Sequence, residues 1–492
     1  MRRAIAAAAL AAAVLVPAGA AESQQRPRFD TQVLALVPSP GFPAQAYVHP
    51  DGRIYEGTYV NMGGDSLPSK VFEYTGDGDR RRVWTVPGQN LAEPHGVQVT
   101  TSDSRGRLVV LDRTPARVLL LDRRTGSFTG YSTFADLKPC PSGQTQPNCS
   151  PSQEDRPPIP NFGAWGPDGS LYVTDYGQAV VWRVPPGGGA AAVWLSDPRL
   201  DGGEFGTTGI ALAGDRRTLL VAQGSSAGLG ALNPTTGKIY SVPIGADGRP
   251  AGMNQLWESR PGDLPDGFGI ARSGRLYVPM VGLPQQIAVV SPQGQEIERF
   301  PEAPGGENGS AVPFDGPSSA RFLGTRLIVA NQSPVAGDPA RQAILDVEAG
   351  EPGLTELIPG LDRTPPAISR VSLTRRTLGV RRSRAARRRA ARRRGATRRR
   401  ARRPGTRLRL RLSEASTVTV RVALRRRTVF RRAGFFTRRL RAGRRSIAFR
   451  GRLDQGRGLR ALPPGRYRFA LRARDAAGNA SPWVFRRFRV VR

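Results

Sequence analysis

The stretch DGSLYVTDYG at residues 168–177 decides the fold class. An Asp-Gly turn leads into a short run of apolar and β-branched residues, which is typical of a hairpin turn followed by a buried strand. Five related stretches begin at residues 51, 105, 215, 273 and 324, with the sequences DGRIYEGTYV, RGRLVVLDR, DRRTLLVAQG, SGRLYVPMV and GTRLIVANQ. The six copies start roughly 50 to 60 residues apart, which is the size of a four-stranded propeller blade.

Other strands accompany each copy. A shorter apolar run precedes it, as in AQAYVHP at 44–50, and a third run follows most copies, as in RVLLLDRRTG at 117–126. A single blade cannot bury both of its faces, so the six must pack around a common axis. The sequence therefore predicts an all-β chain with a six-bladed β-propeller over residues 28–358. A pair of β-sandwiches would not explain a strand triplet that repeats at this interval.

The residues after a linker at 359–368 have a different character. Alternating stretches such as TRLRLRLSE at 406–414 and GRYRFALRARD at 465–475 place arginine on one face and apolar residues on the other. This alternation predicts a small antiparallel β-sandwich of immunoglobulin or fibronectin III character over residues 369–492. An Ala/Arg insertion at 381–403 contains 14 arginines, and like-charge repulsion predicts that it is disordered.

Charge divides the chain in two. Residues 363–492 contain 44 arginines and three acidic residues, whereas residues 1–362 contain 30 basic and 36 acidic residues. The basic part is expected to meet polyanions, namely anionic cell-envelope polymers or lipid headgroups. The alternative is a solvated loop without a partner. Sequence-specific nucleic-acid binding is not predicted, because the arginine run has no docking element or stacking aromatic residue.

The first 21 residues have the parts of a secretory signal peptide. Arg2 and Arg3 precede an apolar run at 4–16, and Ala18, Gly19 and Ala20 form a small-residue cleavage site. The run is shorter than the roughly 20 residues that span a bilayer, so a membrane anchor is the weaker alternative. We expect a secreted or cell-envelope associated protein without a transmembrane segment, and a monomer.

The two cysteines, Cys140 and Cys149, belong to the loop KPCPSGQTQPNCSPSQ at 138–153. Outside the cytosol a disulfide between them is the expected state. A metal clip is the rival interpretation, but no histidine or third cysteine is nearby.

Two stretches carry a resemblance to a known family. These are PNFGAWGPDG at 160–169 and PDG at 265–267, which leads into GRLYV at 274–278. The blade pattern resembles the senescence marker protein, gluconolactonase and regucalcin family and related NHL-type propellers, over roughly residues 30–360. The resemblance implies a divalent cation, usually calcium, at one end of the central tunnel. It also implies hydrolysis of a lactone or phosphoester, with a carboxylate that assists attack by water.

Carried over residue by residue, the resemblance is partial. Asp266 matches the family's aspartate, which serves as metal ligand and catalytic base, and Asn161 matches an asparagine beside substrate and metal. Thr208 stands where the family has a ligand asparagine, and Ala44 stands where it has a ligand glutamate. Because a hard dication prefers six to eight oxygens with more than one carboxylate, the implied metal site of Asp266, Asn161 and Thr208 is incomplete.

The chain has two histidines. His95, in EPHGV at 93–97, is expected at the start of the second blade's inner strand, where it would help to bind substrate. A hydrogen-bonded structural histidine is the alternative. His49 belongs to the turn HPDG at 49–52 and is expected to be exposed to solvent. The chain contains no His-Glu-x-x-His, which argues against zincins.

Two functions therefore stay open. The first is a metal-dependent hydrolase of the lactonase type, with Asp266 as the catalytic residue and Asn161 and His95 at the substrate. The second is a non-catalytic propeller that binds a small molecule, glycan or protein in its tunnel mouth and is retained at the cell envelope by its basic domain.

Overall fold

The computed structural model describes residues 26–59, 66–141, 148–202, 206–225, 236–379, 405–454, 459–475 and 479–491. The predicted signal peptide at 1–21 and the predicted disordered insertion at 381–403 lie outside these residues. The chain forms two compact units, residues 1–359 and 360–492. Among the described residues, no helix has the length and apolar composition needed to cross a bilayer.

The first unit consists of six antiparallel sheets that follow one another along the chain. Blades 1 to 3 comprise β2 (Pro43–Val48), β3 (Ile54–Thr58), β4 (Lys70–Tyr74), β5 (Arg80–Thr85); β6 (Val97–Ser102), β7 (Leu108–Asp112), β8 (Arg117–Leu121), β9 (Phe128–Thr133); and β10 (Pro160–Trp165), β11 (Leu171–Asp175), β12 (Val180–Val184), β14 (Ala192–Ser196). Blades 4 to 6 comprise β15 (Thr207–Leu212), β16 (Thr218–Gln223), β17 (Thr236–Pro243), β18 (Asn254–Pro261); β19 (Gly269–Ile270), β20 (Leu276–Pro279), β21 (Ile287–Val290), β22 (Glu296–Phe300); and β23 (Pro317–Leu323), β24 (Arg326–Asn331), β25 (Ala343–Glu348), β1 (Thr31–Leu36). A short strand, β13 (Gly189–Ala190), adds to blade 2 in parallel with β9.

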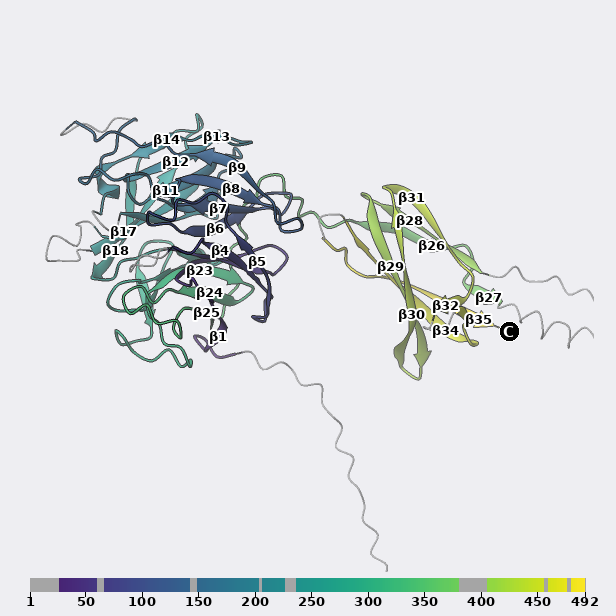
Figure 1. The fold of residues 1–492 in the computed structure, drawn as a ribbon. Coiled ribbons are helices and arrows are strands. Elements are labelled where there is room, and N and C mark those ends of the chain that lie inside the picture. Colours follow the sequence, from purple (N-terminus) through teal and green to yellow (C-terminus); the bar gives the residue numbers. More distant parts are fainter. Residues whose placement is uncertain are drawn as a thin grey trace, which may run out of the picture. The chain divides into compact units, whose positions relative to one another are not determined.

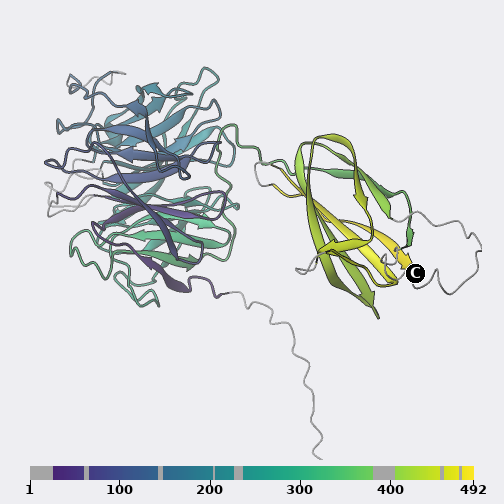
Figure 2. The ribbon, with the colours of Figure 1, turned by 45° about the vertical axis from the view of Figure 1, so that its right-hand side comes forward.

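The six sheets close into a ring. Inner strands of neighbouring blades contact each other: β2 contacts β6, β6 contacts β10, β10 contacts β15, β19 contacts β23, and β23 of the last blade contacts β2 of the first. Blades 4 and 5 are joined by a hydrogen bond from Thr208 Oγ1 to the Pro265 carbonyl. Figures 1 and 2 show the purple first blade beside the green last blade. The prediction of a six-bladed β-propeller is therefore confirmed.

One strand from the beginning of the chain completes the last blade. β1 pairs antiparallel with β25, from Thr31 opposite Val347 to Leu36 opposite Ala343. Arg26 reinforces the junction through its Nη1, which lies 2.9 Å from Asp346 Oδ1. The two ends of the propeller sequence thus share one sheet.

The Asp-Gly pairs form the hairpin turns that the sequence predicts. In the turn before β11, Asp168 Oδ1 accepts a hydrogen bond from the Ser170 amide at 3.0 Å, and Gly169 has a φ of +82°. A positive φ favours glycine, because a Cβ would clash with the backbone.

The turn at His49 departs from its prediction. His49 is only 7% exposed and lies edge-on to the rings of Tyr47 and Tyr55, with ring centroids 6.3 and 6.0 Å away. Its Nδ1 accepts a hydrogen bond from the Asp51 amide at 3.2 Å. The expectation that His49 is exposed is wrong, since the imidazole folds back onto neighbouring aromatic side chains instead of following the turn into water.

Cys140 and Cys149 form a disulfide in the connection between β9 and β10. The Cys140 amide also donates a hydrogen bond to the Ser150 carbonyl at 2.8 Å. The two sides of this loop are therefore held together by a covalent bond and by the main chain.

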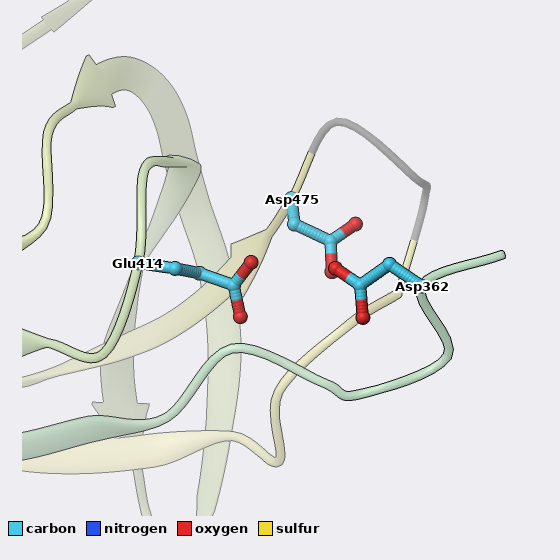
Figure 3. A group of neighbouring side chains, drawn as sticks. All are labelled: Asp362, Glu414 and Asp475. Atoms are coloured by element: carbon cyan, nitrogen blue, oxygen red, sulfur yellow. The ribbon is translucent and has the colours of Figure 1, made fainter. Parts of the chain in front are cut away.

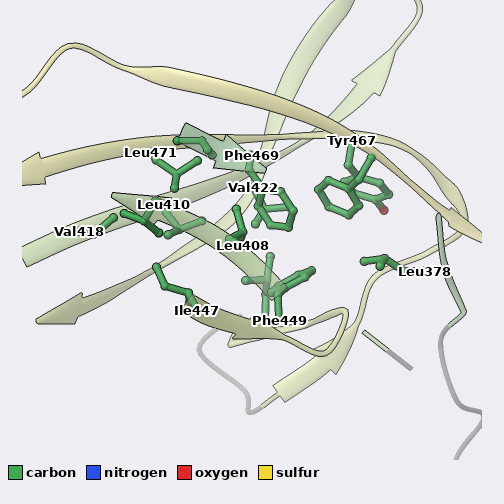
Figure 4. Close-up of a cluster of buried hydrophobic side chains, with 14 of the residues drawn as sticks. Leu378, Leu408, Leu410, Val418, Val422, Ile447, Phe449, Tyr467, Phe469 and Leu471 are labelled. Carbon is green, nitrogen blue, oxygen red and sulfur yellow. The ribbon is translucent and has the colours of Figure 1, made fainter. Parts of the chain in front are cut away.

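The second unit is a β-sandwich whose sheets have the orders β26–β28–β31 and β27–β35–β34–β29–β30. Their strands are β26 (Ile368–Leu373), β27 (Thr377–Gly379), β28 (Thr406–Leu412), β29 (Ser416–Arg426), β30 (Val429–Leu440), β31 (Gly443–Phe449), β34 (Gly465–Arg474) and β35 (Val484–Val491), with a small hairpin of β32 (Arg452–Asp454) and β33 (Leu459–Ala461) beside them. Alternate residues of β28 and β29 are buried, and Figure 4 shows Leu408, Leu410, Val418 and Val422 in a common core with Phe449 and Phe469. The alternation of apolar residues and arginine thus separates the core from the surface.

Candidate functional site at the tunnel mouth

Strand register defines six equivalent positions around the propeller axis. In each blade a residue at the start of the inner strand pairs with a residue at the end of the second strand: Pro43 with Thr58, Val97 with Asp112, Pro160 with Asp175, Thr207 with Gln223, Pro265 with Met280, and Pro317 with Asn331. The next residue along each inner strand forms what we call the mouth ring: Ala44, Gln98, Asn161, Thr208, Asp266 and Ser318. The ring includes all four positions that the family resemblance singled out and adds Gln98 and Ser318, which sequence reasoning missed.

Hydrogen bonds link the mouth ring from blade to blade. Gln98 Nε2 donates to Asn161 Oδ1 at 3.2 Å, and Thr208 Oγ1 donates to the Pro265 carbonyl at 3.0 Å. Ser318 Oγ likewise donates to the Ala44 carbonyl at 3.0 Å. The amide and hydroxyl groups of the ring thus hold neighbouring blades together while keeping acceptor oxygens.

Asp266 is the carboxylic acid of the ring. Its Oδ1 is buried and has no hydrogen-bond partner among the described residues. Burial raises the pKa of the carboxyl to about 8, and only the Gly267 amide opposes the rise. At neutral pH the side chain is therefore mostly uncharged, and its O–H group can donate a hydrogen bond.

Two tyrosines interact electrostatically with Asp266, and one arginine acts on both tyrosines. Tyr59, Arg113 and Tyr176 directly follow β3, β7 and β11, so blades 1 to 3 present them at equivalent places. Burial raises the pKa of both tyrosines, the negative charge of Asp266 raises it further, and Arg113 lowers it. Sequence reasoning missed these residues, although each stands at the same place in the repeat, after GT, LD or TD.

Phe162, which follows Asn161 on β10, contacts another blade. Its side chain is 1% exposed and reaches from blade 3 to Gly267 in blade 5. Blades 3 and 5 are not adjacent, so a side chain that joins them lies close to the axis. Gly267 has no room for a larger residue, because a Cβ would overlap the Phe162 ring and lie 3.1 Å from Ser319 Cβ.

Gly267→Ala is expected to destabilise the propeller by about 1 to 3 kcal/mol, the usual cost of overpacking a closely packed site. Thermal unfolding of the purified chain measures this effect. The control is Gly130→Ala, since a Cβ on Gly130 meets no atom within 4 Å. Adding Phe162→Leu should recover part of the loss; a double variant less stable than the sum of the two single changes would contradict the assigned contact.

His95 lies outside the mouth ring. Its Nδ1 is 2.9 Å from the Glu93 carbonyl oxygen and its Nε2 is 2.7 Å from the Leu67 carbonyl oxygen. Both ring nitrogens thus face main-chain groups of the surrounding loops. The structure brings Asp266, Asn161 and Thr208 into one ring and leaves the predicted substrate contact of His95 without support.

Glu56 is a second buried carboxyl that sequence reasoning missed. Its Oε1 accepts a hydrogen bond from the Gln45 amide at 3.2 Å, and burial holds its pKa well above the usual range. In blade 3, Thr174 Oγ1 likewise accepts a hydrogen bond from the Phe162 amide at 3.0 Å. Glu56 therefore secures the irregular start of an inner strand, and it lay hidden inside the apolar run IYEGT.

An acidic cluster lies in the second unit. Single carboxylate oxygens of Asp362, Glu414 and Asp475 all lie within 4.8 Å of one another, and Figure 3 shows the three groups converging. Burial and the two neighbouring charges raise the pKa of Glu414. Hard cations prefer such oxygens, so any metal titration of this chain must include a variant of the cluster.

These features define the first unit as a six-bladed β-propeller with a buried, mostly polar ring of residues at the starts of its inner strands. No protein-family model and no curated protein matches the sequence. Among solved structures, regucalcin from Agrobacterium tumefaciens, described as a calcium-binding protein, is 15% identical, with 66% of this chain and 98% of that chain covered and a TM-score of 0.43. A luciferin-regenerating enzyme is 14% identical (65% and 95% covered, TM-score 0.41), and virginiamycin B lyase from Staphylococcus aureus is 13% identical (65% and 98% covered, TM-score 0.39). At these identities the likeness concerns the propeller fold alone.

Proposed function

We propose that the propeller binds a small polar ligand at its tunnel mouth and that Asp266 recognises this ligand. The observation that carries the proposal is the buried, unpartnered Oδ1 of Asp266. A buried polar atom without a partner destabilises a fold by about 1 to 3 kcal/mol. The presence of such an atom at Asp266 therefore favours a role in binding. Asn161 and Thr208 add acceptor oxygens, and Tyr59 and Tyr176 add aromatic hydroxyls near the same carboxyl.

The donors of the mouth ring do not fit a resident calcium ion. Asp266 is the one carboxylic acid at the six positions, and Ala44 offers no side-chain oxygen. The Asn161 oxygen already accepts a hydrogen bond from Gln98. Calcium sites usually combine six to eight oxygens with more than one carboxylate. We therefore assign no step to a metal.

A second candidate is hydrolysis of a lactone or related ester. It is favoured by the raised pKa of Asp266, since a carboxyl that titrates near neutrality can act as general base toward water. Asn161, on the same ring, would then orient the substrate. The test below separates this activity from binding alone.

The test measures thermal stabilisation of the chain by neutral sugars, polyols and glucono-1,5-lactone, together with release of acid from the lactone. A ligand that binds only the folded state raises the melting temperature, and Asp266→Asn should abolish the rise. Glu93→Gln is the control, because it makes the same acid-to-amide exchange at an exposed residue of the loop before β6. Equal stabilisation of the parent chain and Asp266→Asn would contradict the proposal.

Calcium, magnesium and zinc are titrated in parallel. If a metal ion raises the melting temperature of Asp266→Asn but not that of Glu414→Gln, the metal binds at the acidic cluster of the second unit. Loss in Asp266→Asn alone would overturn our assignment and restore the metal-dependent hydrolase.

Export through residues 1–21 and retention at the cell envelope remain part of the proposal. The strongly basic composition of residues 363–492 supports the second element. Immunoglobulin or fibronectin III character of the sandwich is likewise proposed, on the basis of its two packed sheets.

A further inference from the structure

One outer face of the sandwich combines arginine with exposed aromatic rings. β29 lies between β30 and β34, and register aligns four residues across the sheet in the order Phe435, Arg421, Ala470 and Phe485. The adjacent row contains Arg432, Ala423, Arg468 and Arg487. Because side chains alternate between the two faces of a strand, both rows point away from the core.

Each ring of this face carries a guanidinium group. Arg432 Cζ lies 4.7 Å from the centroid of Phe435, Arg468 Cζ lies 5.0 Å from that of Phe485, and Arg421 Cζ lies 4.5 Å from that of Trp483. These are cation–π distances. We call these six residues the arginine–aromatic face.

The three arginines of the face lack compensating charge. None of them pairs with a carboxylate among the described residues, and Arg468 Nε is buried without a hydrogen-bond partner. The acids nearest in sequence, Glu414 and Asp475, belong to the acidic cluster. Guanidinium groups that stack on rings keep their N–H edges available, and these edges match phosphate oxygens in geometry and charge.

Exposed apolar surface distinguishes this face from a simple basic patch. Phe435 and Phe485 are 49% and 47% exposed. A polyanion dissolved in water gains little from such side chains, whereas a lipid interface accommodates aromatic rings below the headgroups and arginines among them. Stacking of nucleic-acid bases is disfavoured, because the rings already carry guanidinium groups.

We propose that the arginine–aromatic face docks onto a phospholipid surface that is rich in anionic headgroups. Arg421, Arg432 and Arg468 contact the phosphates, and Phe435 and Phe485 enter the interface. The inference does not depend on the ligand of the propeller, and it assigns the contact to a folded sheet and not to the insertion at 381–403.

The test is co-sedimentation of the full chain with vesicles of phosphatidylcholine alone or with roughly one-third phosphatidylglycerol. Binding is expected only to the anionic vesicles. Each arginine at such a surface contributes about fivefold, so Arg421→Gln, Arg432→Gln and Arg468→Gln together should weaken binding about 100-fold.

The matched control is Arg407→Gln, Arg409→Gln and Arg411→Gln on β28. These three arginines are exposed and lie opposite Ala448, Ser446 and Arg444, so the same charge is removed from a sheet face without aromatic residues opposite. Binding should fall far less than in the first triple variant. If both triple variants lose the same amount of vesicle binding, the attraction depends on the total positive charge and not on this face, and the proposal is overturned.

A second variant, Phe435→Thr with Phe485→Thr, retains every charge and uses a residue that suits strands. It should weaken vesicle binding about 10-fold, while thermal unfolding confirms that each variant is folded. Unchanged binding would refute insertion of the rings. Tighter binding to a poly-dT oligonucleotide than to anionic vesicles, lost in the same arginine variant, would replace the lipid by a nucleic acid.

Discussion

Asp266→Asn is expected to stabilise the propeller at neutral and alkaline pH, by about 5 kcal/mol at pH 8. The native carboxyl is buried, and its Oδ1 has no partner. Asparagine has nearly the same shape and never ionises, so the variant avoids the cost of a buried negative charge. A gain in stability with a loss of ligand binding is typical of a functional residue held in an unfavourable environment.

The pH dependence follows from the raised pKa. In the folded chain the Asp266 carboxyl has a pKa of about 8, against 3.8 for a carboxyl in water. Between these values the folded state holds a proton that the unfolded state has released, so this group makes stability fall as pH rises. The stabilising contribution of the protonated Asp266 carboxyl is fully present below about pH 4 and is lost by about pH 8. The parent chain and Asp266→Asn should therefore converge at pH 4 and diverge progressively above it.

Denaturant unfolding between pH 4 and pH 9 measures the difference. Asp263→Asn is the informative comparison, because Asp263 is also fully buried but pairs with Arg299 at 2.6 Å. Asp263→Asn leaves the buried Arg299 with Glu296 as its remaining carboxylate partner, and loss of the Asp263 charge should destabilise the chain by about 1 to 3 kcal/mol. Two acids three residues apart are thus expected to give effects of opposite sign. An Asp266→Asn variant less stable than the parent at pH 8 would contradict the proposed environment.

The fold could be predicted because its determinants are local and repeated. Each Asp-Gly turn and each apolar run, such as DGSLYVTDYG at 168–177, specifies a hairpin on its own, and six copies leave few alternatives to a ring. The pairing of β1 with β25 was not specified in the same way, since Thr31–Leu36 resembles any short strand. Only closure of the ring identifies its partner.

The candidate site was predictable where it coincides with the repeat. Asp266, Asn161 and Thr208 stand at the starts of inner strands, and the repeat period brings such positions together. The direction of a side chain is not periodic. His95 lies two residues before Val97, where its ring turns toward Glu93 and Leu67. Its contacts depend on how two loops meet, which no local pattern encodes.

Removing β1 is expected to have the largest structural effect. A chain that begins at residue 37 lacks the outer strand of blade 6 and exposes the edge of β25, all of whose residues are buried in the complete propeller. It also loses the stacking of Phe29 on Phe300, whose ring centroids lie 4.7 Å apart. The shortened chain loses the hydrogen bonds between β1 and β25, at about 1 kcal/mol each, and the apolar burial of Phe29. Together these losses should lower the free energy of unfolding by about 5 to 8 kcal/mol. The melting temperature should fall by at least about 10 °C.

A chain that begins at residue 26 is the matched control, because it keeps Arg26 and the whole of β1. It should melt with the parent chain. A synthetic peptide of residues 26–36, added to the shortened chain, should restore the melting temperature in proportion to its concentration, since it binds only the folded state. Because β1 joins the first residues of the propeller to its last blade, a shortened chain as stable as the control would show that the ring does not depend on this closure.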